Sequence, residues 1–417
     1  MNKSISTSPS IASALCRCSL IGLLLAGFTV PGQAALEVVP DVGLYMATDD
    51  NPRLRTTTEG TDTSGALEAR VNFATFGARG EFTAEPRFRG GVYSDTGNGD
   101  LDSDDIFLRT SGRYAWRVME VGFRGDFSDQ SVRTSEVTAA APIDPDIDDP
   151  VDTDTGQFIL YDQTRTRSIF RPYVDFRISD RNSLLIEARR LDVAYSGPIV
   201  PGRSDFDDSY VAVGILRRVD ERNRVTAQFI ASDFESDETQ NKTDTVGAQG
   251  RFTRPISADW TLNLTVGVQR SDYHFIDEDD RIVDNADTDP TFSVVFRRRT
   301  DQTTLNVGAY RRVSPNASGF LTRRNEIRLF LEHQMTPRVS WRTALRLFES
   351  ESVAGVNPLN DRDYIRVELG AQWAVTQRLS LSLGYQFTNQ EFVNRNRGDA
   401  EANQLFTGFN YHGISRR

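Results

Sequence analysis

The feature that most constrains this chain is a two-residue alternation of apolar and polar side chains, which recurs in many segments after residue 34. In residues 261–269 (TLNLTVGVQ) the even positions are apolar and the odd ones are polar or glycine. Residues 379–387 (LSLSLGYQF) alternate in the same way. Because successive side chains of a strand point to opposite faces, this period predicts β-strands with one apolar and one polar face. A helical period is hardly present, so an all-β fold is expected.

The length of these segments separates two kinds of β protein. They run for about 9 to 13 residues, whereas an ordinary globular strand has about 5 or 6. A tilted strand needs about 9 to 11 residues to cross a hydrocarbon core about 30 Å thick. A net charge of -11 and a mean hydropathy of -0.44 would also suit a soluble domain. Strand length therefore favours a transmembrane barrel, with apolar side chains facing lipid and polar ones facing the lumen.

Short and long connections alternate along the chain, about one pair every 35 to 40 residues. Short turns are expected at residues 179–182, 220–223, 257–260, 300–303, 336–338 and 376–378. Such alternation is typical of a barrel with periplasmic turns and extracellular loops. We predict a transmembrane antiparallel up-and-down β-barrel of about 18 strands, within a range of about 16 to 18, forming one domain over residues 35–417.

The predicted strand positions follow from the same pattern. The strands are expected at residues 37–48, 64–76, 79–94, 104–115, 117–128, 164–178, 183–196, 207–218, 223–236, 243–255, 259–273, 290–299, 302–314, 323–335, 339–351, 362–375, 379–393 and 402–412. The longest loop is expected from Asp129 to Gln163. Further acidic loops are expected at Asp95–Asp105 and Asp277–Asp289, all on the extracellular side.

Residues 1–34 are predicted to be a cleaved signal peptide. Lys3 and Arg17 supply positive charge, an apolar run extends from Leu20 to Val30, and small residues end at Ala34. The run is shorter than the roughly 20 residues of a membrane-spanning helix. Both cysteines of the chain lie within this signal, so the exported protein would carry no thiol. We therefore expect the protein in the outer membrane of a Gram-negative bacterium.

Few side chains suit catalysis or metal binding. The three histidines are far apart in the strand order, and only His274 is expected near the extracellular rim. A hydrolase at that rim is the enzyme alternative, but no catalytic residue can be named and a non-enzymatic role is expected. Residues 95–105 have the composition of a calcium loop, yet they lack the EF-hand glycine and final glutamate. A hydrated loop is the simpler interpretation, so neither metal nor cofactor is expected.

The polar face of the strands is rich in arginine. Assigning lipid-facing positions by apolarity leaves a set of inward residues that are candidates for lining the lumen and binding solute: Arg124, Arg171, Arg177, Arg189, Arg251, Arg297, Arg312, Arg328, Arg342, Arg346, Arg366 and Glu368. Carboxylates expected among them are Glu120, Asp126, Asp175, Glu187 and Glu332. A basic lumen would favour anions. Alternatively, these charges pair across strands and fill a plugged interior.

The preference for arginine has two interpretations. Lys3 and Lys242 are the only lysines among 48 basic residues, which leaves 46 arginines. The planar guanidinium suits carboxylate and phosphate partners. A high-GC genome would produce the same bias without any functional meaning.

One hairpin resembles a known group of barrels. It comprises residues 165–174 (RTRSIFRPYV), the turn at 180–182, the return at 183–186 and residues 192–195. It is similar to the outer-membrane β-barrel family associated with exopolysaccharide and capsule biosynthesis operons. The resemblance implies a barrel fold, a role in polysaccharide export or surface handling, and no catalytic residues.

The resemblance and the inward arginines together suggest a non-enzymatic barrel that assists export or surface handling of an exopolysaccharide. The alternatives are a general or substrate-selective diffusion porin, or a plugged structural or surface-interaction barrel. Expected partners are outer-membrane lipid and lipopolysaccharide, the barrel assembly machinery, and polysaccharide or export components, with no nucleic acid. The final strand lacks the usual terminal aromatic of such barrels, because the chain continues from His412 to Arg417.

Overall fold

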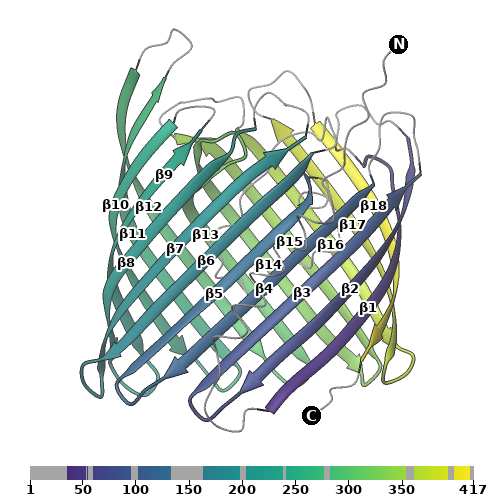
Figure 1. Cartoon of the computed structure of the whole chain (residues 1–417), viewed down its shortest axis with the longest axis horizontal. Helices are drawn as coiled ribbons and strands as arrows, with labels where there is room; N and C mark the ends of the chain where they lie inside the picture. The colour runs from purple at the N-terminus through teal and green to yellow at the C-terminus, as the bar shows by residue number, and fades with distance from the viewer. Residues whose placement is uncertain are drawn as a thin grey trace, which may run out of the picture.

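The chain forms a closed antiparallel β-barrel. The computed structural model describes residues 35–52, 54, 60–94, 102–132, 163–197, 203–237, 241–276, 282–353, 361–392 and 399–413. Within them, 18 strands form one sheet in which chain neighbours pair, and β1 pairs with β18 to close it (Figure 1). No helix among the described residues is long and apolar enough to cross a membrane. The predicted signal peptide lies outside them.

The strands cover most of the described chain. They are β1 Ala35–Asp49, β2 Asp62–Phe76, β3 Gly80–Tyr93, β4 Ser103–Ala115, β5 Met119–Ser131, β6 Thr164–Arg177, β7 Asn182–Ser196, β8 Phe206–Arg218, β9 Arg224–Ser236, β10 Asn241–Pro255, β11 Trp260–Ile276, β12 Ile282–Arg299, β13 Thr303–Pro315, β14 Leu321–Thr336, β15 Val339–Ser352, β16 Arg362–Ala374, β17 Leu379–Phe392 and β18 Asp399–His412.

The predicted fold class and the predicted number of about 18 strands are confirmed. One prediction was wrong: the acidic loop at Asp277–Asp289 is largely strand, because β12 begins at Ile282 and pairs with β11 from there. The polar composition of this part of β12 hid it, since apolar alternation marks a strand only where one face is buried or meets lipid. Most of the other two predicted loops, residues 95–101 and 133–162, lies outside the described residues.

The outer surface of the barrel is apolar. Strand alternation and the continuous register place large side chains such as Phe229, Val266 and Leu383 on one face, where they are 53 to 78% exposed. The aromatic residues Phe176 and Trp373 lie on the same outer face and are also exposed. The opposite face carries buried and half-buried polar side chains. This is the distribution that a barrel solvated by lipid outside and water inside requires.

Six of the short turns share one hydrogen-bond pattern. In each of these six, a hydroxyl or carboxylate at the first position accepts a hydrogen bond from the backbone N–H three residues later. Ser179 accepts from Asn182 (3.1 Å), Asp220 from Asn223 (2.7 Å), Ser257 from Trp260 (3.2 Å), Thr300 from Thr303 (3.0 Å), Thr336 from Val339 (3.0 Å) and Thr376 from Leu379 (2.9 Å). Such local bonding explains why Ser, Thr and Asp recur at the start of these turns.

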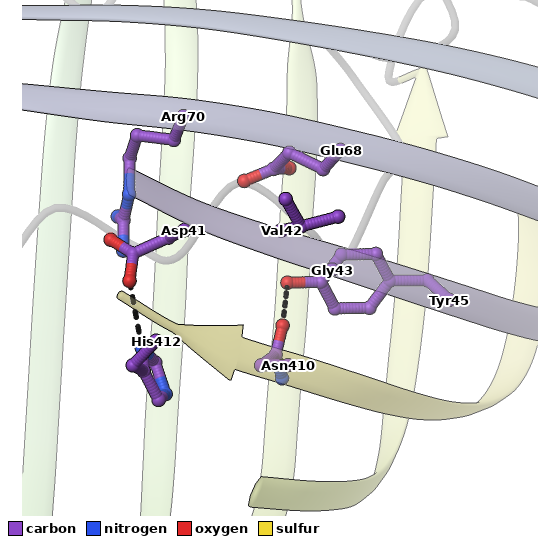
Figure 2. Close-up of a pocket in the computed structure, with 8 residues that line it drawn as sticks. All are labelled: Asp41, Val42, Gly43, Tyr45, Glu68, Arg70, Asn410 and His412. Carbon is purple, nitrogen blue, oxygen red and sulfur yellow. Dashed lines mark hydrogen bonds and ion pairs between the residues drawn. The ribbon is translucent and has the colours of Figure 1, made fainter. Parts of the chain in front are cut away.

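A polar network on the inner face joins the first and last strands. Figure 2 shows Asp41 of β1 between His412 of β18 and Arg70 of β2. Asp41 is 2.9 Å from Nδ1 of His412 and 3.1 Å from Nη2 of Arg70. Four residues farther along β1, the hydroxyl of Tyr45 donates to Asn410 Oδ1 at 2.6 Å. These contacts link β1 to β18 and to β2 on the inner face.

Apolar side chains also gather inside the barrel, at the end with the longer connections. One buried cluster comprises Ile169, Leu191, Val193, Phe206, Phe234, Tyr273, Leu321 and Val353. A second comprises Leu54, Val132, Phe392, Ala400 and Ala402, and the partly buried Tyr195 packs against both. Because many of these residues occupy inner-face positions, the clusters narrow this mouth of the barrel.

Candidate functional site

The strand register places all twelve sequence-predicted lumen residues on the inner face. On β14, for example, Ile327 is exposed on the outside while Arg328 is buried on the inside, and Arg328 lies opposite Arg346 of β15. Arg346 in turn lies opposite Arg366 of β16. Three arginines therefore stand side by side on neighbouring strands. Their action on a solute remains a prediction.

A buried glutamate organises this part of the wall. The side chain of Glu326 on β14 has no exposed surface. Its Oε2 accepts a hydrogen bond from Arg312 Nη2 at 2.7 Å, and its Oε1 accepts from Arg328 Nε at 2.6 Å and Arg346 Nε at 2.7 Å. Charge-assisted bonds of this kind are about twice as strong as neutral ones. Glu326 thus fixes three guanidinium groups, contributed by three adjacent strands, on the inner wall.

An aromatic pair holds further arginines beside Glu326. The rings of Phe348 on β15 and Tyr364 on β16 stack 4.7 Å apart at an interplanar angle of 15°. The guanidinium carbon of Arg324 lies 4.4 Å from the Phe348 ring centre, and those of Arg346 and Arg362 each lie 5.1 Å from it. These separations allow cation–π attraction, which restricts where each guanidinium points.

A second glutamate lies farther along the same wall. Glu368 on β16 has a nearly buried side chain, with Oε1 2.8 Å from Arg342 Nη2 and Oε2 3.6 Å from Arg366 Nη2. The neighbouring inner positions of β17 carry Gln386, Thr388 and Gln390, all buried. The wall therefore continues from arginine and carboxylate into neutral amides and hydroxyls.

Basic groups outnumber acidic ones on the inner positions of β13 to β16. The arginines there are Arg312, Arg324, Arg328, Arg342, Arg346, Arg362 and Arg366, and the glutamates are Glu326, Glu332 and Glu368. Seven positive and three negative side chains give these strands a formal charge of +4. Every one of these groups is carried by a hydrogen-bonded strand, so the charge is fixed in space rather than distributed over a flexible chain.

The other predicted arginines are dispersed around the barrel. Arg124 and Arg171 lie opposite each other on β5 and β6. Arg189 forms an ion pair with Asp208 and lies 5.1 Å from the ring of Tyr210. The remaining three, Arg177, Arg251 and Arg297, lie near the short-turn ends of β6, β10 and β12. Six of the twelve predicted residues therefore lie together on β13 to β16, and the other six are spread over five other strands.

Sequence reasoning missed the centre of this wall. Glu326, Arg324 and Arg362 were absent from the predicted set. The alternation could have found them, because Glu326 and Arg324 lie two and four residues before Arg328, and Arg362 lies four residues before Arg366. Phe348 was missed because an aromatic residue in an alternating strand is ordinarily assigned to the lipid face. Its inward direction follows from its register with Glu326.

The described residues offer little for acid–base or metal chemistry. His274 is exposed, and its Nδ1 lies 2.7 Å from Asp284. His333 contacts the hydroxyl of Thr303 at 2.9 Å, and His412 contacts Asp41. Within the part of the chain that the structure describes, no group of three or more His, Cys, Asp or Glu side chains is placed to hold a metal ion.

Neither a family model nor a curated protein matches this sequence. Solved structures with a similar arrangement include Pseudomonas aeruginosa OpdK with vanillate, at 11% identity and a TM-score of 0.45, covering 91% of this chain and 99% of that one. Acinetobacter baumannii OccAB2 has 11% identity and a TM-score of 0.45, with 92% and 98% covered. A BenF-like porin from Pseudomonas fluorescens Pf-5 has 12% identity and a TM-score of 0.45, with 90% and 98% covered.

Proposed function

We propose that this chain is a non-enzymatic channel of a Gram-negative outer membrane that passes small anionic solutes. The apolar outer face and the alternation of short turns with longer connections support the membrane assignment. Lipopolysaccharide outside and the barrel assembly machinery during insertion are the partners that such a location implies. The predicted signal peptide would direct export to that membrane.

The observation that carries the proposal is the excess of arginine over glutamate on the inner wall of β13 to β16. An anion about 4 Å from a guanidinium group gains about 4 kcal/mol at an effective dielectric constant of about 20. A cation at the same place is repelled by a similar amount. Fixed arginines along a pore therefore favour anions. The two glutamates that anchor them reduce this preference without reversing it.

Charge reversal on the inner wall tests the proposal. Reversal potentials in a salt gradient would be measured across planar bilayers for the unmodified barrel and for the double variant Arg342→Glu/Arg346→Glu. We expect an anion preference that weakens or inverts in the variant. Arg270→Glu is the matched control, because Arg270 is an exposed residue of the outer face that pairs with Asp272. A preference unaffected by the double variant would refute the role of the arginine wall.

Export of an exopolysaccharide is the narrower proposal that the sequence resemblance suggests. An acidic polymer would engage several arginines at once, so its affinity would rise steeply with chain length. The apolar clusters at the mouth favour small solutes, because a polymer would have to displace them. Acidic oligosaccharides of increasing length, added as blockers of the ion current, distinguish export of a polymer from passage of small solutes. Block that strengthens with each added sugar supports the polymer, and block independent of length supports the small solute.

A further inference from the structure

The β11–β12 hairpin and the β13–β14 hairpin are paired to each other over only part of their length. Only Phe292–Arg299 of β12 pair with β13, although β12 begins at Ile282. The upper part of β12 pairs with β11 alone, and the upper part of β13 pairs with β14 alone. Figure 1 shows the β11–β12 hairpin rising beyond its neighbours at the upper left. Towards the ends beyond Phe292, β12 and β13 are therefore not paired with each other as strands.

The β13–β14 hairpin lies inside the barrel relative to the β11–β12 hairpin. Val313 and Leu321 belong to the outward-facing set of β13 and β14, whereas Tyr273 and Phe275 belong to the inward-facing set of β11. Yet these four side chains belong to one apolar assembly. An outer face can meet an inner face only if the first hairpin has bent behind the second. The end of the β13–β14 hairpin therefore extends into the lumen.

The turn of the β13–β14 hairpin contacts residues at β8 and β10, which lie beyond β11 and β12 in the sheet. The backbone N–H of Ser204, just before β8, donates to the carbonyl of Ala317 at 2.9 Å. Nδ2 of Asn241, the first residue of β10, donates to the carbonyl of Gly319 at 3.0 Å. Ala317 is 2% exposed. Hydrogen bonds to two backbone carbonyls of the turn therefore hold it in a defined position inside the mouth.

One arginine fastens the hairpin in this position. Arg323, on the outer face of β14, donates from Nε to Asp289 Oδ1 at 2.5 Å and from Nη2 to Asp287 Oδ2 at 2.9 Å. Both aspartates are on β12. Its Nη1 is also 3.8 Å from Glu351 on β15. The side chain of Asp289 is only 2% exposed, so the pair with Arg323 is shielded from water. Charged hydrogen bonds in such surroundings hold the two hairpins together.

A glycine lets the turn fit its seat. Gly319 has a φ of +74°, and a Cβ at this position would lie 2.1 Å from Ser236 Oγ and 2.9 Å from the Cβ atoms of Ser204 and Ser236. A side chain at 319 therefore cannot be accommodated without moving the turn away from β8 and β9. The seat is built for a turn without a side chain at this point.

We propose that the β13–β14 hairpin end, residues 313–323, is a gate that occupies the mouth of the channel and is latched by Arg323 to Asp289 and Asp287. Releasing the latch moves the hairpin out of the lumen and raises the size limit for solutes. The effect on transport rests on the proposed channel function. The position and latching of the hairpin do not, so they are tested separately.

Chemical labelling tests the latch without any transport measurement. Cys16 and Cys18 are changed to Ser in the full chain, so that Ala317→Cys supplies its single thiol. The rate of reaction with a membrane-impermeant maleimide is compared with and without Arg323→Gln. Loss of a charged hydrogen bond shifts the ratio of seated to released hairpin roughly tenfold or more, so labelling should accelerate by about that factor. An unchanged rate in a folded barrel would overturn the latch.

Two neutralisations of opposite sign separate a latch from a simple change of charge. Arg323→Gln removes one positive charge and Asp289→Asn removes one negative charge. Both should increase the rate at which large neutral sugars swell liposomes containing the barrel, because both break the same pair. Arg270→Gln, which breaks an ion pair on the outer face, should have no effect. Rates that are unchanged, or that move in opposite directions, would overturn the gate. A wild-type barrel impermeable even to small ions would instead refute the channel function.

A glycine pair provides the test if the charge variants do not fold. Gly319→Ala should release the turn by steric conflict and accelerate labelling of Ala317→Cys. Gly60→Ala is its matched control, because Gly60 also has a positive φ (+113°) but has nothing within 4 Å of an added Cβ. Equal labelling rates in these two variants would contradict the seated turn.

Discussion

Replacing Glu326 by glutamine should destabilise the barrel strongly. The change keeps the side-chain shape but removes the negative charge that accepts hydrogen bonds from Arg312, Arg328 and Arg346, at 2.6 to 2.7 Å. The side chain is fully buried among these guanidinium groups. Removing one partner from a buried ionic group costs about 3 to 5 kcal/mol, because the remaining charges lose their compensation. We expect a loss of that size in the free energy of unfolding.

Urea unfolding of the barrel in lipid vesicles, followed by tryptophan fluorescence, measures this loss. The midpoint should fall while the dependence on urea stays constant, which indicates a change in stability rather than in compactness. Glu332→Gln is the matched control, since Glu332 is an exposed inner-face residue of the same strand. It should alter the free energy of unfolding by less than about 0.5 kcal/mol. Equal midpoints for the two variants would refute the argument that Glu326 anchors the arginine wall.

Three further predictions concern other parts of the molecule. Phe348→Leu should lower the free energy of unfolding by about 1 to 2 kcal/mol, because its cation–π contacts with Arg324, Arg346 and Arg362 are lost while an apolar side chain remains. The midpoint of urea unfolding measures this loss. Asp41→Ala should weaken the β18–β1–β2 seam by about 1.5 to 3 kcal/mol, since Arg70 and His412 lose their acceptor, and heat-dependent mobility on gels would reveal it. At the exposed turn after β8, hydrogen bonds from the Asn223 side chain and from the backbone N–H groups of Arg222 and Asn223 lower the pKa of Asp220. Because the folded-state pKa is lowered, the associated stability is present at neutral pH and is lost as pH falls through that pKa; NMR titration should show the pKa return towards its ordinary value in Asn223→Ala.

The barrel could be predicted from sequence because the physical constraint on it is local. A strand between lipid and a polar lumen must alternate, and it must be long enough to cross the hydrocarbon. Each of the 18 strands therefore carries its own signal, as in residues 261–269 and 379–387. Strand segments that do not cross the hydrocarbon need not alternate, so they could not be predicted in this way. The start of β12 lies beyond the apolar part of the wall, and its acidic sequence was assigned to a loop.

The inner wall was only partly predictable, because its organisation depends on contacts between strands. Alternation alone places Arg328, Arg346 and Arg366 inside, but it does not reveal that Glu326 gathers the first two with Arg312. The inward bend of the β13–β14 hairpin is still less visible in sequence. Val313 and Leu321 follow the ordinary outward pattern, and the bend is revealed by contacts between strands, such as the apolar cluster that joins them with the inward-facing Tyr273 of β11.

The central claim is that an arginine-lined inner wall makes this barrel an anion channel. It is tested most directly by the reversal potential of the unmodified barrel in a planar bilayer separating two concentrations of potassium chloride. We expect stable conductance and a potential whose sign corresponds to chloride passing more readily than potassium. A cation-selective current, or a folded barrel without conductance, would contradict it.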